Sequence, residues 1–157
     1  IEPDIMTVAK GIGGGFPLGA CLSSEKASIG MVKGKHGSTY GGNPLACAVG
    51  FEVMKNVLEK GFLENVRITS GYFSQKILGV INEFPSIFEE LRGYGLMLGL
   101  KTKIDNVSFT SEALNQNLLL APASDNVVRI LPPLNITKKE IDQATDMLRK
   151  TAKRIVS

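Results

Sequence analysis

Apolar residues recur along this chain with two different spacings, and the spacing changes near Asn43. Residues 5–9 form a short apolar run that leads into glycines, and residues 18–22 form a second one, which is typical of strands. Beyond residue 44 the apolar residues recur at helical spacing, with Asn43 placed as the N-cap and Pro44 as the first helical residue. We therefore expect two short strands, the first of them buried, and then a helix that ends at Gly61.

The rest of the chain mixes helices with strands. An amphipathic helix is predicted over residues 63–83, and Pro85 stops it. The last helix has the clearest local signal, because Thr137 and Glu140 form a capping box and Ile136 and Ile141 are placed as a hydrophobic staple. Between them the pattern predicts a short helix over residues 110–117 and strands over residues 87–91, 96–101, 118–121 and 127–131.

This order of elements indicates an α/β portion followed by a compact α+β domain. We expect the boundary near residues 55–61 and place it between residues 57 and 58. The chain has no initiator methionine and opens directly into the first apolar run, so we expect it to be a fragment of a longer protein.

The composition is typical of a globular protein, since 43% of the residues are hydrophobic and 21% are charged. A formal net charge of only +3 gives no support for a nucleic-acid or membrane partner. Cys21 and Cys47 stand singly, so neither a metal site nor a disulfide framework is expected, and a reducing, cytoplasmic setting fits best.

Lys10 is the first candidate for chemistry, because it ends the first apolar run and precedes a run of glycines. Backbone without side chains lets a planar cofactor or substrate approach, and a partly desolvated lysine is an imine-forming nucleophile. A solvated lysine at the mouth of a glycine turn is the ordinary alternative. A nucleotide fingerprint is a weak alternative, because Phe16 and Pro17 interrupt the required spacing.

Ser38 and Thr39 are candidates for binding an anion. They lie just before the predicted helix, where backbone amides and the positive end of the helix dipole favour a group such as a phosphate. Glycine, serine and asparagine before a helix are also ordinary turn and capping residues. Both interpretations stay open on these residues alone.

Two arginines complete the candidates. Arg129 lies inside the apolar run 127–131, where a guanidinium is costly unless it is paired, and its planar fork matches a carboxylate. Arg92 precedes Gly93 between two predicted strands. For either arginine the commoner role is a structural ion pair or a head group that reaches solvent.

Four segments, in this order, resemble the class III pyridoxal-phosphate-dependent aminotransferases. They are DIMTVAKGIGGGFPLGA (residues 4–20), HGSTYGGNPLA (36–46), LRGYGLMLG (91–99) and VRILPPL (128–134). The resemblance implies the PLP-dependent transferase fold type I, with residues 1–57 as the end of the large α/β domain and residues 58–157 as the small C-terminal α+β domain. Residues 92–100 and 131–134 are most similar to acetylornithine aminotransferases, and ornithine and 4-aminobutyrate aminotransferases come next.

The resemblance also implies roles for the candidate residues. It implies that Lys10 holds pyridoxal 5'-phosphate and moves a proton between substrate and cofactor. Thr39, with Ser38 beside it, would donate to the cofactor phosphate of the neighbouring subunit in a homodimer. Arg129 would bind the carboxylate of the amino- or oxo-acid substrate, and we assign Arg92 a structural role.

The expected function is therefore transfer of an amino group between N-acetylornithine, or a related omega-amino acid, and 2-oxoglutarate, in arginine biosynthesis. The family's phosphate-binding loop, ring-covering aromatic residue and pyridine-nitrogen aspartate are expected earlier than residue 1, so we expect this chain alone to be inactive. Two other functions stay open: a non-catalytic phosphate- or nucleotide-binding module, and a structural domain that oligomerises through the helix over residues 44–60.

Overall fold

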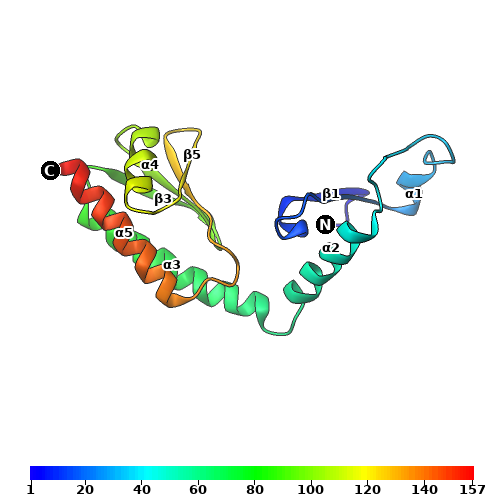
Figure 1. The fold of residues 1–157 in the computed structure, drawn as a ribbon, viewed down its shortest axis with the longest axis horizontal. Coiled ribbons are helices and arrows are strands. Elements are labelled where there is room, and N and C mark those ends of the chain that lie inside the picture. Colours follow the sequence, from blue (N-terminus) through cyan, green and yellow to red (C-terminus); the bar gives the residue numbers. More distant parts are fainter. The chain divides into compact units, whose positions relative to one another are not determined.

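The computed structural model describes all 157 residues, which divide into two compact units, Ile1–Phe62 and Leu63–Ser157. The first unit carries β1, β2, α1 and α2, and the second carries β3 to β6 and the body of α3, α4 and α5 (Figure 1). The predicted boundary between residues 57 and 58 falls at the end of α2. None of the helices combines the length and the apolar character that crossing a bilayer requires.

The first unit is built on two antiparallel strands. β1 (Ile5–Ala9) pairs with β2 (Gly19–Ser23), and the 3-10 helix η1 (Lys10–Gly13) begins the connection between them. A single turn of helix, α1 (Glu25–Ser28), follows β2. Both strands that the sequence predicts are therefore present.

The long helix of this unit is α2 (Pro44–Val57), and it begins where the sequence predicts. The side chain of Asn43 accepts a hydrogen bond of 2.9 Å from the amide of Ala46, which satisfies one of the free amides of the first turn. The predicted end at Gly61 is wrong, because the helix stops at Val57. Residues 58–61 form irregular turns, and Gly61 has φ of 90°.

The predicted burial of the first strand is also wrong. Ile5 is 59% exposed and Met6 is 46% exposed. A sheet of two strands has too little of its own structure to cover both faces. The apolar run therefore predicted the strand correctly, whereas its burial requires a further layer that this unit does not contain.

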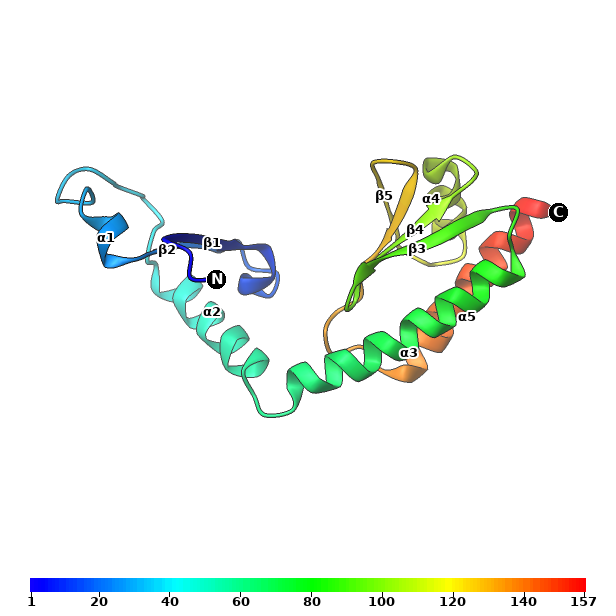
Figure 2. The same cartoon turned by 180° about the vertical axis from the view of Figure 1, so that it is seen from behind.

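The second unit is a four-stranded antiparallel sheet with two long helices on one face (Figures 1 and 2). The strands lie in the order β3-β4-β6-β5, and they are β3 (Phe88–Tyr94), β4 (Met97–Thr102), β5 (Ala121–Ala123) and β6 (Val127–Ile130). The helices are α3 (Phe62–Glu83) and α5 (Lys138–Val156), and the shorter α4 (Asn106–Asn115) connects β4 to β5.

The helices and the inner face of the sheet enclose one apolar core, and the outer face carries the charged residues. The core residues include Phe73, Ile77, Val80, Leu98, Leu100, Val128, Ile130, Ile141 and Leu148. The rings of Phe88 and Phe109 meet edge to face, with centroids 5.3 Å apart. Side chains alternate between faces along a strand, so Gly99, Lys101 and Arg129 belong to the outer face.

Most predicted elements of this unit are present with shifted ends. The α5 capping box between Thr137 and Glu140 forms as predicted. α4 begins earlier than predicted because the carboxylate of Asp105 accepts from the amide of Ser108 and caps the helix there. β5 lies slightly later than predicted and contains Pro122, which an edge strand tolerates.

Candidate active site

Lys10 lies directly after β1 and has an unusual backbone conformation. Its φ is 56°, in the left-handed region that non-glycine residues seldom occupy. Holding a side-chain-bearing residue there costs about 1–3 kcal/mol, and such strain is concentrated at functional sites. Lys10 is the only lysine of the chain with this conformation.

An open concavity of ≈ 700 Å³ lies beside Lys10, lined by Lys10, Gly11, Gly14, Gly15, Phe16, Pro17 and Leu18. Three of these residues are glycines, so a flat ring can approach the backbone closely. The side chain of Lys10 is itself exposed. In this unit a flat ring can therefore approach Lys10 along glycine backbones, as the sequence predicts. The amine of Lys10, however, is not desolvated.

Glycines also let the loop after Lys10 pack directly on α2. A Cβ atom at Gly50 would lie 2.6 Å from Cδ2 of Leu18, and one at Gly14 would lie 2.8 Å from Cγ2 of Val53. Sequence reasoning missed this role of Gly50. The signal was available, because an isolated glycine inside a helical pattern often has a packing reason.

Ser38 and Thr39 lie exposed in the irregular segment that precedes α2. The side-chain hydrogen bonds of this segment are made by Asn43, with the carbonyl of Tyr40 and the amide of Ala46, so both hydroxyls are available to a ligand. Neither residue lines the concavity beside Lys10. Since β2 runs antiparallel to β1, the segment after β2 leaves from the end of the strand pair opposite η1 (Figure 1).

Arg129 lies on the outer face of the sheet in the second unit. In the strand register it stands between Gly99 of β4 and Ala121 of β5, so its neighbours on both sides are small. It makes no side-chain hydrogen bond or ion pair in the structure, and its side chain is exposed. Of its apolar neighbours in the strand, Val128 and Ile130 face the core and point away from it, whereas Val127 lies on the same outer face.

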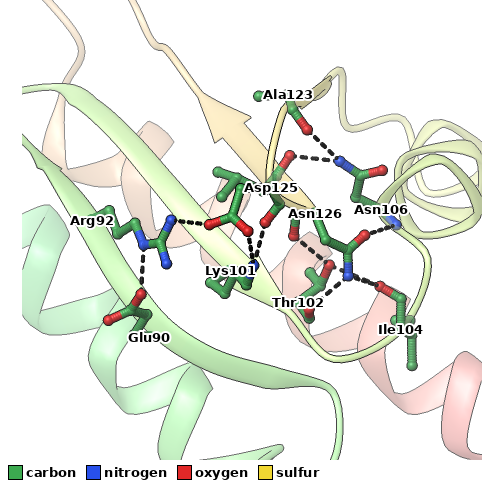
Figure 3. Close-up of polar contacts among 10 residues, drawn as sticks. Glu90, Arg92, Lys101, Thr102, Ile104, Asn106, Ala123, Asp125 and Asn126 are labelled. Carbon is green, nitrogen blue, oxygen red and sulfur yellow. Dashed lines mark hydrogen bonds and ion pairs between the residues drawn. The ribbon is translucent and has the colours of Figure 1, made fainter.

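Unlike Arg129, Arg92 forms ion pairs within the chain. Its guanidinium contacts Glu90 and Asp125, each at 2.5 Å (Figure 3). The hydrogen bond that Arg92 donates to Asp125, and next the one that it donates to Glu90, raise the pKa of Arg92 above its ordinary value. These contacts support the structural role that we assign to Arg92.

Cysteines and metal-binding clusters are the remaining features that could carry chemistry. Cys21 and Cys47 are free thiols on the surface. The structure contains no group of three or more His, Cys, Asp or Glu side chains that could hold a metal ion.

A mixed α/β chain with a lysine in this setting is expected of a pyridoxal-phosphate-dependent enzyme, and comparison with known proteins gives the family. The family model described as Aminotransferase class-III matches residues 1–152, so the chain belongs to the class III aminotransferases. The acetylornithine aminotransferase of Mesorhizobium japonicum is 50% identical over 153 residues, which are 98% of this chain and 38% of that protein. The acetylornithine aminotransferase of Rhodobacter capsulatus is 49% identical over 152 residues, which are 97% of this chain and 39% of that protein.

Solved structures agree with this assignment. Ornithine δ-aminotransferase from Plasmodium falciparum matches with a TM-score of 0.87 and 30% identity, over 98% of this chain and 41% of that one. N-acetylornithine aminotransferase from Stenotrophomonas maltophilia matches with a TM-score of 0.84 and 32% identity, over 99% and 41%. The chain thus has the fold of part of a class III aminotransferase and spans about two fifths of the length of these relatives.

The family also identifies a cofactor. Class III aminotransferases use pyridoxal phosphate. A structure of ornithine aminotransferase from Toxoplasma gondii has this cofactor at partial occupancy in the active site.

Proposed function

We propose that this chain supplies part of the active site of an acetylornithine aminotransferase, which transfers an amino group between N-acetylornithine and 2-oxoglutarate in arginine biosynthesis. The observation that carries the proposal is Lys10, a strained lysine at the rim of a glycine-lined concavity in a class III aminotransferase chain. Identities of 50% and 49% with two acetylornithine aminotransferases support N-acetylornithine as the amino donor, and ornithine is the first alternative donor to be tested. 4-Aminobutyrate is the other donor to be tested.

The residues beside Lys10 fit pyridoxal phosphate. The glycine backbones leave room for a flat ring, and Nζ of Lys10 is the amine that would hold it. When bound, this cofactor would withdraw electrons from the substrate and make acidic the C–H bond of the carbon that carries the reacting amino group. Nζ of Lys10 would then serve as the base that removes this proton and as the acid that returns it.

Ser38 and Thr39 would anchor the cofactor phosphate of a neighbouring subunit. Both hydroxyls are exposed and available, and they precede the amino-terminal end of α2, where amides and the helix dipole favour an anion. Neither residue lines the concavity beside Lys10 of its own chain, and in this proposal they act in the site of the other subunit of a homodimer.

Arg129 would bind the carboxylate that N-acetylornithine and 2-oxoglutarate have in common. A guanidinium can make two parallel hydrogen bonds to a carboxylate, and Arg129 has no partner within the chain that would compete. Its small neighbours, Gly99 and Ala121, leave its edges accessible.

The exposed strands of the first unit fit a place inside a larger domain. In this proposal residues 1–57 belong to the large cofactor-binding domain and residues 58–157 form the small domain. Further residues of the enzyme would cover Ile5 and Met6 and exclude water from Lys10, as an efficient imine-forming lysine requires. We therefore expect no turnover of N-acetylornithine by the isolated chain, in keeping with a cytoplasmic, homodimeric enzyme that needs its remaining residues.

A chimera tests the proposal. In the Mesorhizobium japonicum enzyme, this chain replaces the 153-residue segment that it matches. We expect the chimera to transfer the amino group of N-acetylornithine to 2-oxoglutarate, and borohydride reduction followed by peptide mass spectrometry to find the cofactor on Lys10. Lys10→Ala should abolish turnover, because it removes both the attachment point and the base, whereas Lys35→Ala, at another exposed lysine of the first unit, should not.

Two results would count against the proposal. Cofactor found on a different lysine of a folded chimera would remove Lys10 from the site. Turnover of ornithine or 4-aminobutyrate in preference to N-acetylornithine would leave the family unchanged and overturn the proposed substrate.

A further inference from the structure

The hydroxyls of Ser38 and Thr39 are followed directly by a tight turn that leads into α2. The turn consists of Tyr40–Asn43, and it is closed by the backbone amide of Asn43, which donates to the carbonyl of Tyr40 at 3.3 Å. Gly42 has φ of 69°, the left-handed conformation that a type II turn requires of its third residue. The path of the backbone between the two hydroxyls and the helix is therefore defined by this turn.

The side chain of Asn43 joins the turn to the helix. Its amide nitrogen donates to the carbonyl of Tyr40 at 2.8 Å, and its oxygen accepts from the amide of Ala46 at 2.9 Å. The second bond caps α2, and the first ties the residue next to Thr39 to the same side chain. One planar group thus holds backbone on both sides of the turn, which restricts movement of the hydroxyl-bearing residues relative to the start of the helix.

Gly41 brings the turn into contact with Ser38. A Cβ atom at residue 41 would lie 2.9 Å from Cβ of Ser38 and 3.1 Å from its Oγ. Carbon atoms that are not bonded to each other prefer a separation of about 3.5–4.0 Å. The side chain of Ser38 therefore packs directly against the backbone of Gly41, and a larger residue there would displace its hydroxyl.

We propose that Asn43 is a positioning residue for the cofactor phosphate, and that it acts through the hydroxyls of Ser38 and Thr39. This inference rests on the proposed phosphate-binding role of those two residues. Groups that are held in place before a ligand binds lose less conformational freedom on binding, so they bind it more tightly. The side chain of Asn43 and the contact at Gly41 supply this order before the phosphate arrives.

The ordinary role of Asn43 is that of a helix cap, and this role alone leads to a different result. Serine is as good a cap as asparagine, because its hydroxyl can accept from the amide of Ala46. Serine has no side-chain amide that could hold the carbonyl of Tyr40. Asn43→Ser therefore keeps the cap and adds no charge, but it releases the turn. A residue that only caps the helix would not distinguish a ligand with a phosphate from one without.

The test compares two ligands that differ only in the phosphate. Dissociation constants for pyridoxal phosphate and pyridoxal are measured by absorbance titration of the cofactor-free chimera described above. Both ligands present the same aldehyde to Lys10, so a change in the ratio of the two constants reports a change in the phosphate contacts. We expect Asn43→Ser to lower the preference for pyridoxal phosphate about two- to tenfold, the range for one neutral hydrogen bond. Gly41→Ala should lower it as well, whereas Gly30→Ala, at a glycine with no atom within 4 Å of its Cβ position, should not.

Removal of both hydroxyls separates this inference from the proposed function. The double variant Ser38→Ala, Thr39→Val should lower the preference for pyridoxal phosphate, and if it does not, the phosphate-binding role itself is wrong. In that double variant Asn43→Ser should have little further effect, because the groups through which it acts are gone.

Three results would each overturn the positioning role of Asn43. The first is an unchanged ratio in Asn43→Ser although the variant without hydroxyls has lost its preference. The second is an equal loss in Gly30→Ala. The third is an effect of Asn43→Ser that persists undiminished when both hydroxyls are absent.

Discussion

Single residues with positive φ define both the candidate site and the sheet that carries Arg129. Gly93 is the most constrained of them, with φ of 115° in β3 just before the turn to β4. A Cβ atom there would lie 2.2 Å from the carbonyl oxygen of Met97, which is backbone and cannot move aside without breaking the strand pair. The tight turn that ends β3 at Tyr94 therefore requires glycine at this position.

We predict that Gly93→Ala destabilises the second unit by at least the cost of a strained residue, about 1–3 kcal/mol. Gly71→Ala is the control, because Gly71 lies on the exposed side of α3 with no atom within 4 Å of its Cβ position. That change should stabilise the helix by about 0.5–1 kcal/mol. Urea unfolding followed by circular dichroism gives both values, and equal stabilities of the two variants would show that the turn adapts.

At the scale of elements, α3 and α5 are joined by polar contacts as well as by the core. Asp142 accepts a hydrogen bond of 2.7 Å from the hydroxyl of Tyr72 and pairs with Nζ of Lys76 at 2.7 Å. Further along, Arg149 pairs with Glu83 at 2.9 Å. The hydrogen bonds from Lys76, first, and Tyr72, next, lower the pKa of Asp142 below its ordinary 3.8.

This shift predicts how the contribution of Asp142 depends on pH. A carboxylate whose pKa is lowered on folding stabilises the protein above its unfolded-state pKa, and the stabilisation is lost as the pH falls through the folded-state pKa. We expect Asp142→Asn to lower the Tm at neutral pH and to make progressively less difference below about pH 4. Glu89→Gln, which removes a carboxylate without an ion pair, is the control, and a Tm deficit of Asp142→Asn that persists undiminished in acid would contradict the assignment.

The elements show why some boundaries could be predicted and others could not. Asn43, Thr137 and Glu140 act within one helical turn, so their caps were evident from the sequence. Asp105 also caps locally, but an aspartate with no apolar run directly after it is equally typical of a loop. The ends of β3 and β5 depend on their pairing partners, which local pattern does not specify.

At the scale of the whole molecule, the two units differ in how completely they bury their apolar residues. The second unit encloses Phe73, Leu100 and Leu148 in one core. The first leaves Ile5, Met6 and Leu22 exposed on its strands. Burial of the first strand could not be predicted from its own sequence, because it depends on whether another layer of structure covers the two-stranded sheet.

We therefore predict that residues 63–157 fold on their own. They should unfold in urea in one cooperative transition, and Leu100→Ala should lower its free energy by about 2–5 kcal/mol because it leaves a cavity in the core. Leu119→Ala, at an exposed leucine, should change it little. A gradual, non-cooperative loss of circular dichroism would show instead that the second unit depends on the first.

The candidate site could be predicted only in part, because a sequence shows local patterns and not long-range contacts. Lys10, Ser38, Thr39 and Arg129 could be named as candidates from the sequence, because each stands in a short segment with its own chemical pattern. Gly50 could not, because its importance arises from a contact with a residue far away in the sequence, Leu18. Long-range pairing of this kind becomes visible only when strands and helices are placed in space.

The packing of Gly50 and Gly14 gives α2 a mechanical consequence. The helix starts immediately after the segment with Ser38 and Thr39, and its middle bears the loop that follows Lys10. The helix therefore links the segment with the proposed phosphate-binding hydroxyls, at its amino-terminal end, to the loop after the proposed imine-forming lysine, which packs on its side. A tilt of α2 would move both segments together. A larger side chain at residue 50 would therefore displace the amine of Lys10 and the hydroxyls of Ser38 and Thr39 at once, although it contacts none of them.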